Sequence, residues 1–219
     1  MTVVIIDTET TGLEPLTSYS KDRYSGVRTK KGEAAQIVSI GCKQINEITD
    51  RTESSYKCFF NPKIFDRTDI ETDERLKPYN PTYNIKTYET EENMLSEFWT
   101  YLNDEVDKPI ISGFNFDFDW KFLKLRSLLH NIKITRFDKY TNQRIDIRER
   151  LNSNTFQSGT TLHDYCDFLG ISYIDDDFTG KDMPQYYTDR RYTDIIVHQM
   201  NDVKITAELY MRMCKCNLL

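Results

Sequence analysis

Near the start of the chain, residues 3–13 read VVIIDTETTGL. The first four residues are apolar and β-branched, which is typical of a central strand that is buried on both faces of a sheet. Side chains at i and i+2 of a strand point to the same face, so Asp7 and Glu9 place two carboxylates together. Such a pair can share a hard divalent cation, which relieves its mutual repulsion. A solvent-facing acidic strand end is the alternative interpretation.

The rest of the chain continues with strands and then with helices. Apolar patterning predicts further strands over 36–44, 55–60 and 109–113. It predicts helices over 91–102, 117–130 and 162–169, and a long one that begins at Thr193, which is suited to be its N-cap. Gly170 is suited to close the helix that precedes it. This order indicates an α/β fold in which helices pack on a mixed sheet.

Two stretches carry turn-forming or polar residues instead of a periodic pattern. Residues 17–33 are polar and basic and contain two glycines, which predicts a long basic loop. Residues 63–90 are acidic and rich in turn formers, so we expect a surface excursion with little regular structure. No internal repeat, low-complexity tract or linker divides the sequence, and we therefore expect a single domain over residues 1–219.

Composition restricts the class of protein. The chain has 219 residues, of which 38% are hydrophobic and 29% charged, as in ordinary globular proteins. Its longest unbroken apolar run is residues 3–6, whereas a bilayer span needs about 20 residues. The first residues also lack the features of an export signal. We therefore expect no membrane partner and a cytoplasmic or nuclear location.

The charge is unevenly distributed along the chain. The formal net charge of −6 argues against non-specific phosphate binding over the whole surface. However, residues 121–150 contain nine basic and three acidic side chains, and residues 21–31 contain five basic and one acidic. Such local basic segments are compatible with a nucleic-acid partner, although solvated faces of helices and loops explain them equally well.

Two further groups of polar residues stand at the ends of predicted elements. Residues 113–123 read GFNFDFDWKFL, where a strand ends and a helix begins. An acid at a helix start accounts for Asp117 as a cap or dipole partner, but Asp119 has less need of that role. In the last helix, His198 and Asp202 are one turn apart and lie on one face. Alone, such a pair is more typical of a surface contact.

Together these segments resemble the DEDD, or DnaQ-like, 3′→5′ exonucleases of the ribonuclease-H-like superfamily. Residues 7–13 match the first motif of that family almost letter for letter. Asn115 and Asp119, with the aromatic and apolar residues beside them, match the second motif. Asp202, followed by residues 206–210, is similar to the third. The segment 162–171 is also similar to the penultimate helix of the family, so the resemblance spans residues 1–213.

The position of the histidine is unusual for this family. Its histidine branch usually has His five residues before the final Asp, whereas its tyrosine branch has Tyr four residues before. His198 is four residues before Asp202, so it combines the residue of one branch with the spacing of the other. We assign the chain to the histidine branch with an atypical HxxxD spacing. His130 and His163 match no motif, and we expect them to be structural or surface residues.

The resemblance implies phosphodiester hydrolysis with two divalent ions, Mg²⁺ or Mn²⁺, about 3.5–4 Å apart. It implies that Asp7, Glu9, Asp119 and Asp202 are the metal ligands and that His198 is the general base. Imidazole is suited to that task because its unperturbed pKa is about 6.5. The resemblance assigns the terminal nucleotide to a substrate pocket that comprises Thr10, Thr11, Gly12, Leu13 and Asn115. A position of Leu13 in the core is the equal alternative.

The function that the resemblance implies is a metal-dependent 3′→5′ exonuclease that releases nucleoside monophosphates. We favour the 3′ end of single-stranded DNA as substrate, in proofreading or repair, with a polymerase or replication protein as a possible partner. An exonuclease that trims RNA 3′ ends is the first alternative, since only the 2′-hydroxyl distinguishes the two polymers at the site. A catalytically inactive nucleic-acid-binding module is the second alternative, but it would have no chemical need of four carboxylates.

Overall fold

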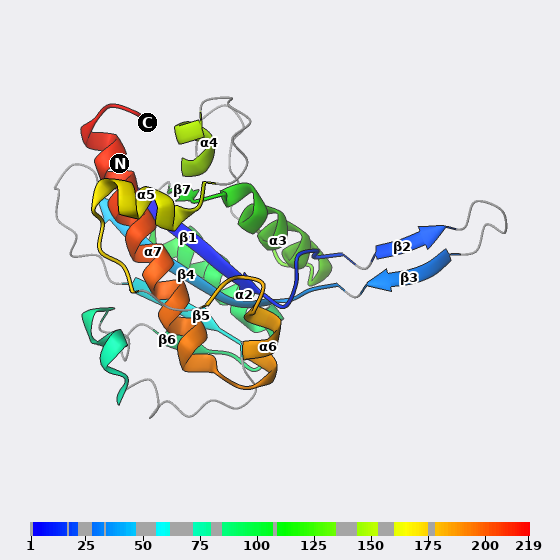
Figure 1. Cartoon of the computed structure of the whole chain (residues 1–219). Coiled ribbons are helices and arrows are strands. Elements are labelled where there is room, and N and C mark those ends of the chain that lie inside the picture. The colour runs from blue at the N-terminus through cyan, green and yellow to red at the C-terminus, as the bar shows by residue number, and fades with distance from the viewer. Residues whose placement is uncertain are drawn as a thin grey trace.

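The computed structural model describes residues 2–16, 18–21, 28–32, 34–46, 56–61, 72–79, 85–106, 109–134, 144–152, 160–174 and 178–219. Its main sheet has six strands in the order β6-β5-β4-β1-β7-β8. The strands are β1 (Thr2–Thr10), β4 (Ile37–Asn46), β5 (Tyr56–Phe60), β6 (Ile85–Thr87), β7 (Ile110–Gly113) and β8 (Arg144–Asp146). β1 pairs antiparallel with β4 and parallel with β7, and it lies in the middle of the molecule (Figure 1). The predicted mixed sheet is therefore confirmed, with the strand that carries Asp7 and Glu9 inside it.

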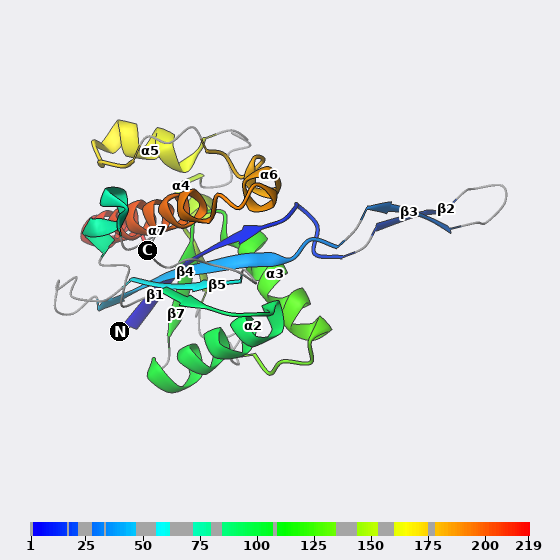
Figure 2. The same cartoon turned by 90° about the horizontal axis from the view of Figure 1, so that it is seen from below.

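Helices cover both faces of this sheet. They are α2 (Glu91–Thr100), α3 (Phe116–Leu129), α4 (Ile147–Asn152), α5 (Leu162–Leu169), α6 (Met183–Thr188) and α7 (Tyr192–Lys215). A 3₁₀-helix, η1 (Glu74–Tyr79), precedes β6, and a π-helical turn, η3 (Tyr101–Glu105), continues α2. Figure 2 shows α2 and α3 on one side of the sheet and α5, α6 and α7 on the other. In the described part of the chain, no helix is both long and apolar enough to cross a membrane.

The apolar run of β1 contributes to both cores, as its sequence predicts. Val4 and Ile6 pack into the cluster that includes residues of α2 and α3, whereas Val3 and Ile5 pack into the cluster that includes residues of α7. All four side chains are 0–1% exposed. This alternation continues to the end of the strand, so it directs Asp7 and Glu9 to the α7 face and Thr8 to the α3 face.

The close approach of α7 to the sheet depends on a glycine in β4. A Cβ atom at Gly41 would lie 2.7 Å from Cγ of Gln199, which is closer than real contacts allow. The missing side chain therefore lets α7 cross the sheet beside Asp7, since Gly41 is the register partner of Asp7. This crossing brings the neighbours of Gln199 on α7 to the end of β1.

The prediction of a long loop over residues 17–33 is wrong. Two strands, β2 (Ser18–Lys21) and β3 (Arg28–Gly32), pair antiparallel and form a separate two-stranded sheet. Figures 1 and 2 both show this ribbon extending away from the body of the molecule. Because these two strands form a sheet of their own, their sequence needs no apolar alternation to fit the main sheet, and this is why they lack the usual periodic pattern.

Two smaller predictions also need correction. The stretch 63–90 contains η1 and β6, although residues 62–71 and 80–84 lie outside the described residues. The last helix begins at Tyr192, so Thr193 is not its N-cap. Instead, Asp194 in the first turn accepts hydrogen bonds from Arg191 at 2.7 Å and from Arg75 at 3.0 Å. Charged partners thus stabilise this helix start in place of a hydroxyl cap.

Candidate active site

Asp7 lies in β1 under α7, where Gln199 donates a hydrogen bond to its backbone carbonyl at 3.2 Å. The Oδ2 atom of Asp7 is out of contact with solvent and accepts no hydrogen bond from any described residue. Burial raises the pKa of Asp7 well above its ordinary value, and the charges of Asp119, Glu9 and Asp202 raise it further. A hydrogen bond from the side chain of Gln199 lowers this pKa only in part, so the site concentrates carboxylates whose repulsion the described protein groups do not fully offset.

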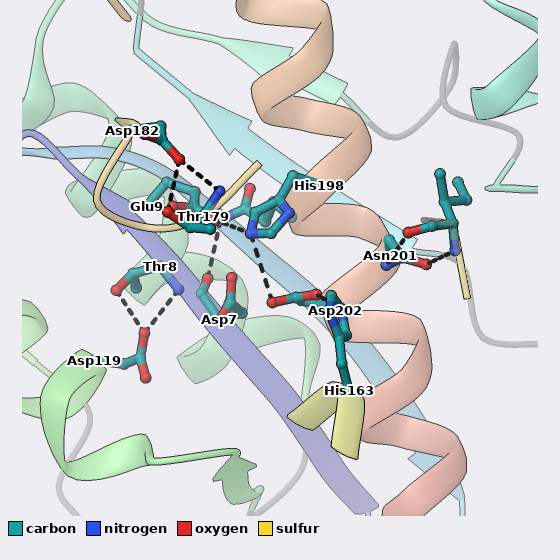
Figure 3. Close-up of polar contacts among 12 residues, drawn as sticks. Asp7, Thr8, Glu9, Asp119, His163, Thr179, Asp182, His198, Asn201 and Asp202 are labelled. Atoms are coloured by element: carbon teal, nitrogen blue, oxygen red, sulfur yellow. Dashed lines mark hydrogen bonds and ion pairs between the residues drawn. The ribbon is translucent and has the colours of Figure 1, made fainter. Parts of the chain in front are cut away.

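His198 stands between two of these carboxylates. Its Nε2 atom lies 3.8 Å from Oε1 of Glu9 and 3.8 Å from Oδ2 of Asp202 (Figure 3). The imidazole side chain is 8% exposed and contacts the ring of Phe178, with 4.2 Å between the ring centroids. One helical turn thus directs His198 and Asp202 to the same site, and the tertiary structure adds Glu9 from β1.

Asp119 reaches the site from the first turn of α3. Its Oδ1 atom accepts hydrogen bonds from the backbone N–H of Thr8 at 2.8 Å and from the Thr8 hydroxyl at 2.7 Å. Burial raises the pKa of Asp119 to about 7, although the bonds from Thr8 act in the opposite direction. Asp117, by contrast, is exposed, as expected of an acid at a helix start. Thr8 therefore connects α3 to the central strand and holds Asp119 beside it.

Of the residues predicted to line a nucleotide pocket, Thr10 ends β1, residues 11–13 follow it, and Asn115 precedes α3. The Thr10 hydroxyl donates to the carbonyl of Gly12 at 2.7 Å, and Thr11 exchanges two hydrogen bonds with Gln36. Leu13 is 69% exposed, so its alternative placement in the core is wrong. Asn115 adopts a left-handed conformation with φ of 58°, and Arg148 donates to its Oδ1 atom. A short ordered turn therefore presents Leu13 outward next to the carboxylates.

His163 is a residue at the site that the sequence analysis missed. It belongs to the first turn of α5, and its Nε2 atom lies 3.8 Å from Oδ1 of Asp202. Its ring stacks on Tyr173, with 4.4 Å between centroids and an interplanar angle of 9°. The similarity of segment 162–171 to a family helix was the only available signal, because no spacing relates His163 to Asp202. The expectation that His163 is a structural or surface residue therefore did not anticipate its position beside Asp202.

His130 has the structural position that we expected. It contacts Glu91, which also binds Arg126, and this buried cluster is formed by α2 and α3 on the opposite face of the sheet. Arg126 belongs to the basic segment 121–150 but adds no charge to its surface, because it is 4% exposed and paired with Glu91. Lys121 is paired with Glu14 at 2.8 Å, and residues 135–143 lie outside the described residues. This segment is therefore less available to a polyanion than its sequence indicated.

The described residues contain no three His, Cys, Asp or Glu side chains already arranged as a metal-binding group. The residues at the site nevertheless fit a hard cation. Oδ2 of Asp7 and Oδ1 of Asp202 are removed from solvent and accept no hydrogen bond within the described part of the chain. Carboxylate oxygens are the ligands that Mg²⁺ and Mn²⁺ prefer, and a bound cation would offset the charge that raises the pKa of Asp7. Without it, the carboxylates repel one another.

A mixed sheet whose central strand ends in carboxylates, with acids from a helix on each face, matches the exonuclease fold of the ribonuclease-H-like superfamily. The chain belongs to the family described as DNA polymerase family B, exonuclease domain, whose match covers residues 17–176. This match includes Asp119 and His163. It does not extend to Asp7, Glu9 or the acids of α7, so their grouping rests on the geometry described above.

A relative from Methanocaldococcus jannaschii is similar to part of the chain. The uncharacterized protein MJ0365 of Methanocaldococcus jannaschii is 40% identical over 140 residues, which represent 60% of this chain and 78% of the relative. The name of this relative assigns it no activity. The family therefore establishes a nuclease, of a superfamily that uses divalent metals, and leaves the ions, the polarity and the polymer to be proposed.

Proposed function

We propose that this chain is a 3′→5′ exonuclease that requires two divalent ions, Mg²⁺ or Mn²⁺, and releases nucleoside monophosphates from single-stranded DNA. The arrangement of His198 carries this proposal. A buried imidazole lies 3.8 Å from each of two carboxylates, Glu9 and Asp202, beside an unsatisfied oxygen of Asp7. A structural role does not need this concentration of uncompensated acids, because each buried carboxylate without a partner lowers the stability of the folded protein.

Four carboxylates would hold the ions. Asp7 would be the central ligand because it has Glu9, Asp119 and Asp202 as charged neighbours, and Glu9 and Asp202 would act as ligands together with it. Asp119 would take part directly or through water, since Thr8 occupies its Oδ1 atom and leaves the other oxygen available. The ions, when bound, would activate the attacking water and stabilise the leaving oxygen.

His198 would accept a proton from the attacking water. Its Nε2 atom faces the carboxylates, and the Phe178 ring limits the orientations that the imidazole can adopt. Because the side chain is 8% exposed, it would exchange protons at the site and not with bulk solvent. A positioned general base of this kind contributes about 10²–10⁴-fold to a rate.

The substrate would approach along the turn that follows β1. Thr10, Thr11 and Gly12 would offer backbone groups to the terminal sugar, and the exposed Leu13 would contact the last base. Ribbon β2–β3 starts directly after this turn, and its nine strand residues include four cations and no acid. Such a ribbon is suited to the phosphate backbone that leads to the site.

DNA is the favoured polymer because the family is described as the exonuclease domain of DNA polymerases. For the same reason, we propose proofreading or repair as the role and a polymerase or replication protein as a partner. A cytoplasmic or nuclear location and the arrangement of residues 1–219 as a single domain remain part of this proposal. An RNA substrate is an outcome that the following experiment can reveal.

The test uses the full chain with single-stranded DNA and RNA oligomers of matched sequence, labelled at either end, in Mg²⁺, Mn²⁺ or EDTA. We expect 5′-labelled DNA to shorten one nucleotide at a time, with release of nucleoside monophosphates, and EDTA to stop the reaction. Asp7→Asn, purified identically, controls for a contaminating nuclease. Faster loss of RNA would identify an RNA-trimming enzyme. Full activity in EDTA contradicts the metal requirement, and no cleavage of either polymer contradicts the exonuclease.

A further inference from the structure

Asp202 lies between two imidazoles that come from different helices. His198 of α7 faces its Oδ2 atom, and His163 of α5 faces its Oδ1 atom, each with Nε2 at 3.8 Å (Figure 3). The two histidines therefore approach the two oxygens of one carboxylate. The proposed mechanism uses His198, whereas it leaves His163 without a role.

The position of the His163 ring is fixed by its own surroundings. The ring stacks on Tyr173, whose hydroxyl donates to Asp167 of α5 at 3.0 Å. The start of α5 is closed by a capping box between Thr161 and Asp164. His163 belongs to α5 and Tyr173 to the segment directly after it. The imidazole therefore keeps its orientation when α5 is in place.

The segment that follows α5 is attached to α7 by hydrogen bonds on both sides of Asp202, and Arg212 of α7 donates to the carbonyl of Leu169 at the end of α5 at 2.6 Å. Asn201 accepts from the backbone N–H of Ile174 at 2.9 Å, and Lys204 donates to the carbonyl of Ser172 at 3.0 Å. These contacts involve the residue before Asp202 and a residue half a turn after it. The distance between His163 and Asp202 is therefore set by the docking of two elements and not by a flexible side chain alone.

Oδ1 of Asp202 is the atom that needs a donor. It is out of contact with solvent and accepts no hydrogen bond from a described residue. The present separation of 3.8 Å exceeds a hydrogen bond, but a movement of about 1 Å would bring His163 Nε2 within range. A carboxylate that holds a cation through one oxygen is oriented by a hydrogen bond to the other, and removal of such a bond typically weakens metal affinity about 10–100-fold.

We propose that His163 is a positioning residue whose Nε2–H donates to Oδ1 of Asp202 and thereby orients the other carboxylate edge toward the bound cation. This inference rests on the proposed metal-dependent function. It assigns His163 no contact with substrate. It also explains why a 34% exposed histidine stands beside the acids on an ordered helix.

The test compares His163→Leu, which retains bulk without a donor, with His163→Gln, whose amide N–H₂ reaches about as far as Nε2. Mn²⁺ binding to the full chain without nucleic acid is measured by calorimetry and electron paramagnetic resonance. We expect about 10–100-fold weaker binding for the Leu variant and substantial recovery for the Gln variant. Phe168→Ala, at an 85% exposed position of α5, is the matched control and should bind Mn²⁺ normally.

A second readout is the Mn²⁺ concentration that gives half-maximal cleavage. It should rise for His163→Leu in parallel with the dissociation constant, while kcat at saturating Mn²⁺ stays near that of the parent. Should His163→Leu fail to fold, His163→Asn replaces it, because the shorter amide cannot reach Asp202.

The outcomes separate this inference from the proposed function. Unchanged Mn²⁺ affinity in the Leu variant overturns the positioning role, and unchanged affinity with a raised KM for the oligomer indicates a substrate contact instead. Equal weakening in the Gln and Leu variants also overturns it. A parent chain that binds Mn²⁺ but cleaves nothing contradicts the nuclease proposal alone, whereas a parent that binds no Mn²⁺ contradicts both.

Discussion

Glu91 and Asp7 present carboxylates to opposite faces of the same sheet, but their surroundings differ. Glu91 is 5% exposed, and its oxygens accept from the N–H of Ile37 at 2.7 Å, from Arg126, and from His130 at 2.9 Å. Asp7 has one oxygen that is removed from solvent and has no donor among the described residues, and three further acids surround it. The protein neutralises the first carboxylate itself, whereas the second requires a proton or an external cation.

This difference indicates how to distinguish a structural from a functional buried charge. Burial is common to both, so it is not the criterion. The Glu91 cluster contains an acid, a guanidinium and an imidazole in direct contact, and a disruption there should reduce stability. The Asp7 cluster contains acids and a histidine at longer distances, and a disruption there should reduce activity while it preserves or improves the stability of the metal-free chain.

The largest expected effect is a collapse of activity at the Asp7 cluster. Asp7→Ala should reduce turnover by more than about a thousandfold, because the proposed central ligand of the ions is removed. Single-turnover cleavage of a 5′-labelled oligomer measures it. Glu14→Gln, an exposed carboxylate near the same turn, is the control and should stay within a few-fold of the parent. Most of the activity remaining in Asp7→Ala would mean that the metal site lies elsewhere.

The next effect is a decrease in stability at the Glu91 cluster. Arg126→Met should lower the free energy of unfolding by about 3–5 kcal/mol, because Glu91 is left buried without its guanidinium partner. Urea denaturation monitored by circular dichroism measures the change. The double variant with Glu91→Met should recover much of this stability, since two apolar side chains replace the pair. A stable Arg126→Met protein would show that the comparison does not hold.

His198→Ala should reduce turnover by about 10²–10⁴-fold while Mn²⁺ binding and substrate affinity stay near those of the parent. The reason is that the proposed proton acceptor is removed but the carboxylate ligands remain. Rapid-quench kinetics and calorimetry measure the two properties separately. His198→Ala with a nearly parental rate would exclude this residue as the base and direct attention to another group, such as Tyr192.

The metal-free chain should become less stable as pH rises toward neutrality. The pKa of Asp119 is raised to about 7 in the folded chain, against about 3.9 when unfolded, so the folded state binds more protons between these values. Stability is therefore present at low pH and declines as pH rises through about 7. Tm in EDTA between about pH 5 and pH 8 should show a steeper decline for the parent than for Asp119→Asn. Added Mg²⁺ should reduce the decline, and identical slopes would contradict this assignment.

The smallest effect concerns the β2–β3 ribbon. Replacement of Lys21, Arg28, Lys30 and Lys31 by Ser should weaken binding of single-stranded DNA at low salt. The slope of log affinity against log salt should fall by about 0.7 for each phosphate that the ribbon no longer neutralises. Fluorescence anisotropy with Ca²⁺ in place of Mg²⁺ measures both quantities. Lys215→Ser, at an exposed position on the C-terminal turn of α7, is the control. An unchanged slope would remove the ribbon from the proposed substrate path.

Much of the fold and part of the site could be predicted from the chain alone. The apolar run before Asp7 predicted the central strand, and the pattern with Gly170 predicted α5 with its observed bounds. The pairs Asp7 with Glu9 and His198 with Asp202 were also accessible, because strand and helix periodicity place near neighbours on one face. In each case the signal comes from residues that are close in sequence and share one regular element.

Only the tertiary structure decided which of these pairs come together and which charges are neutralised by a partner. Thr8 holds Asp119, His163 approaches Asp202 and Arg126 neutralises Glu91, and each partner comes from a different element. The β2–β3 ribbon could not be predicted from the sequence either, since its strands pair with each other and their sequence has no apolar pattern. Periodicity reports the face on which a side chain lies, but contacts between elements depend on how those faces pack. The sequence by itself therefore determined the central strand and its acids, and packing determined their partners.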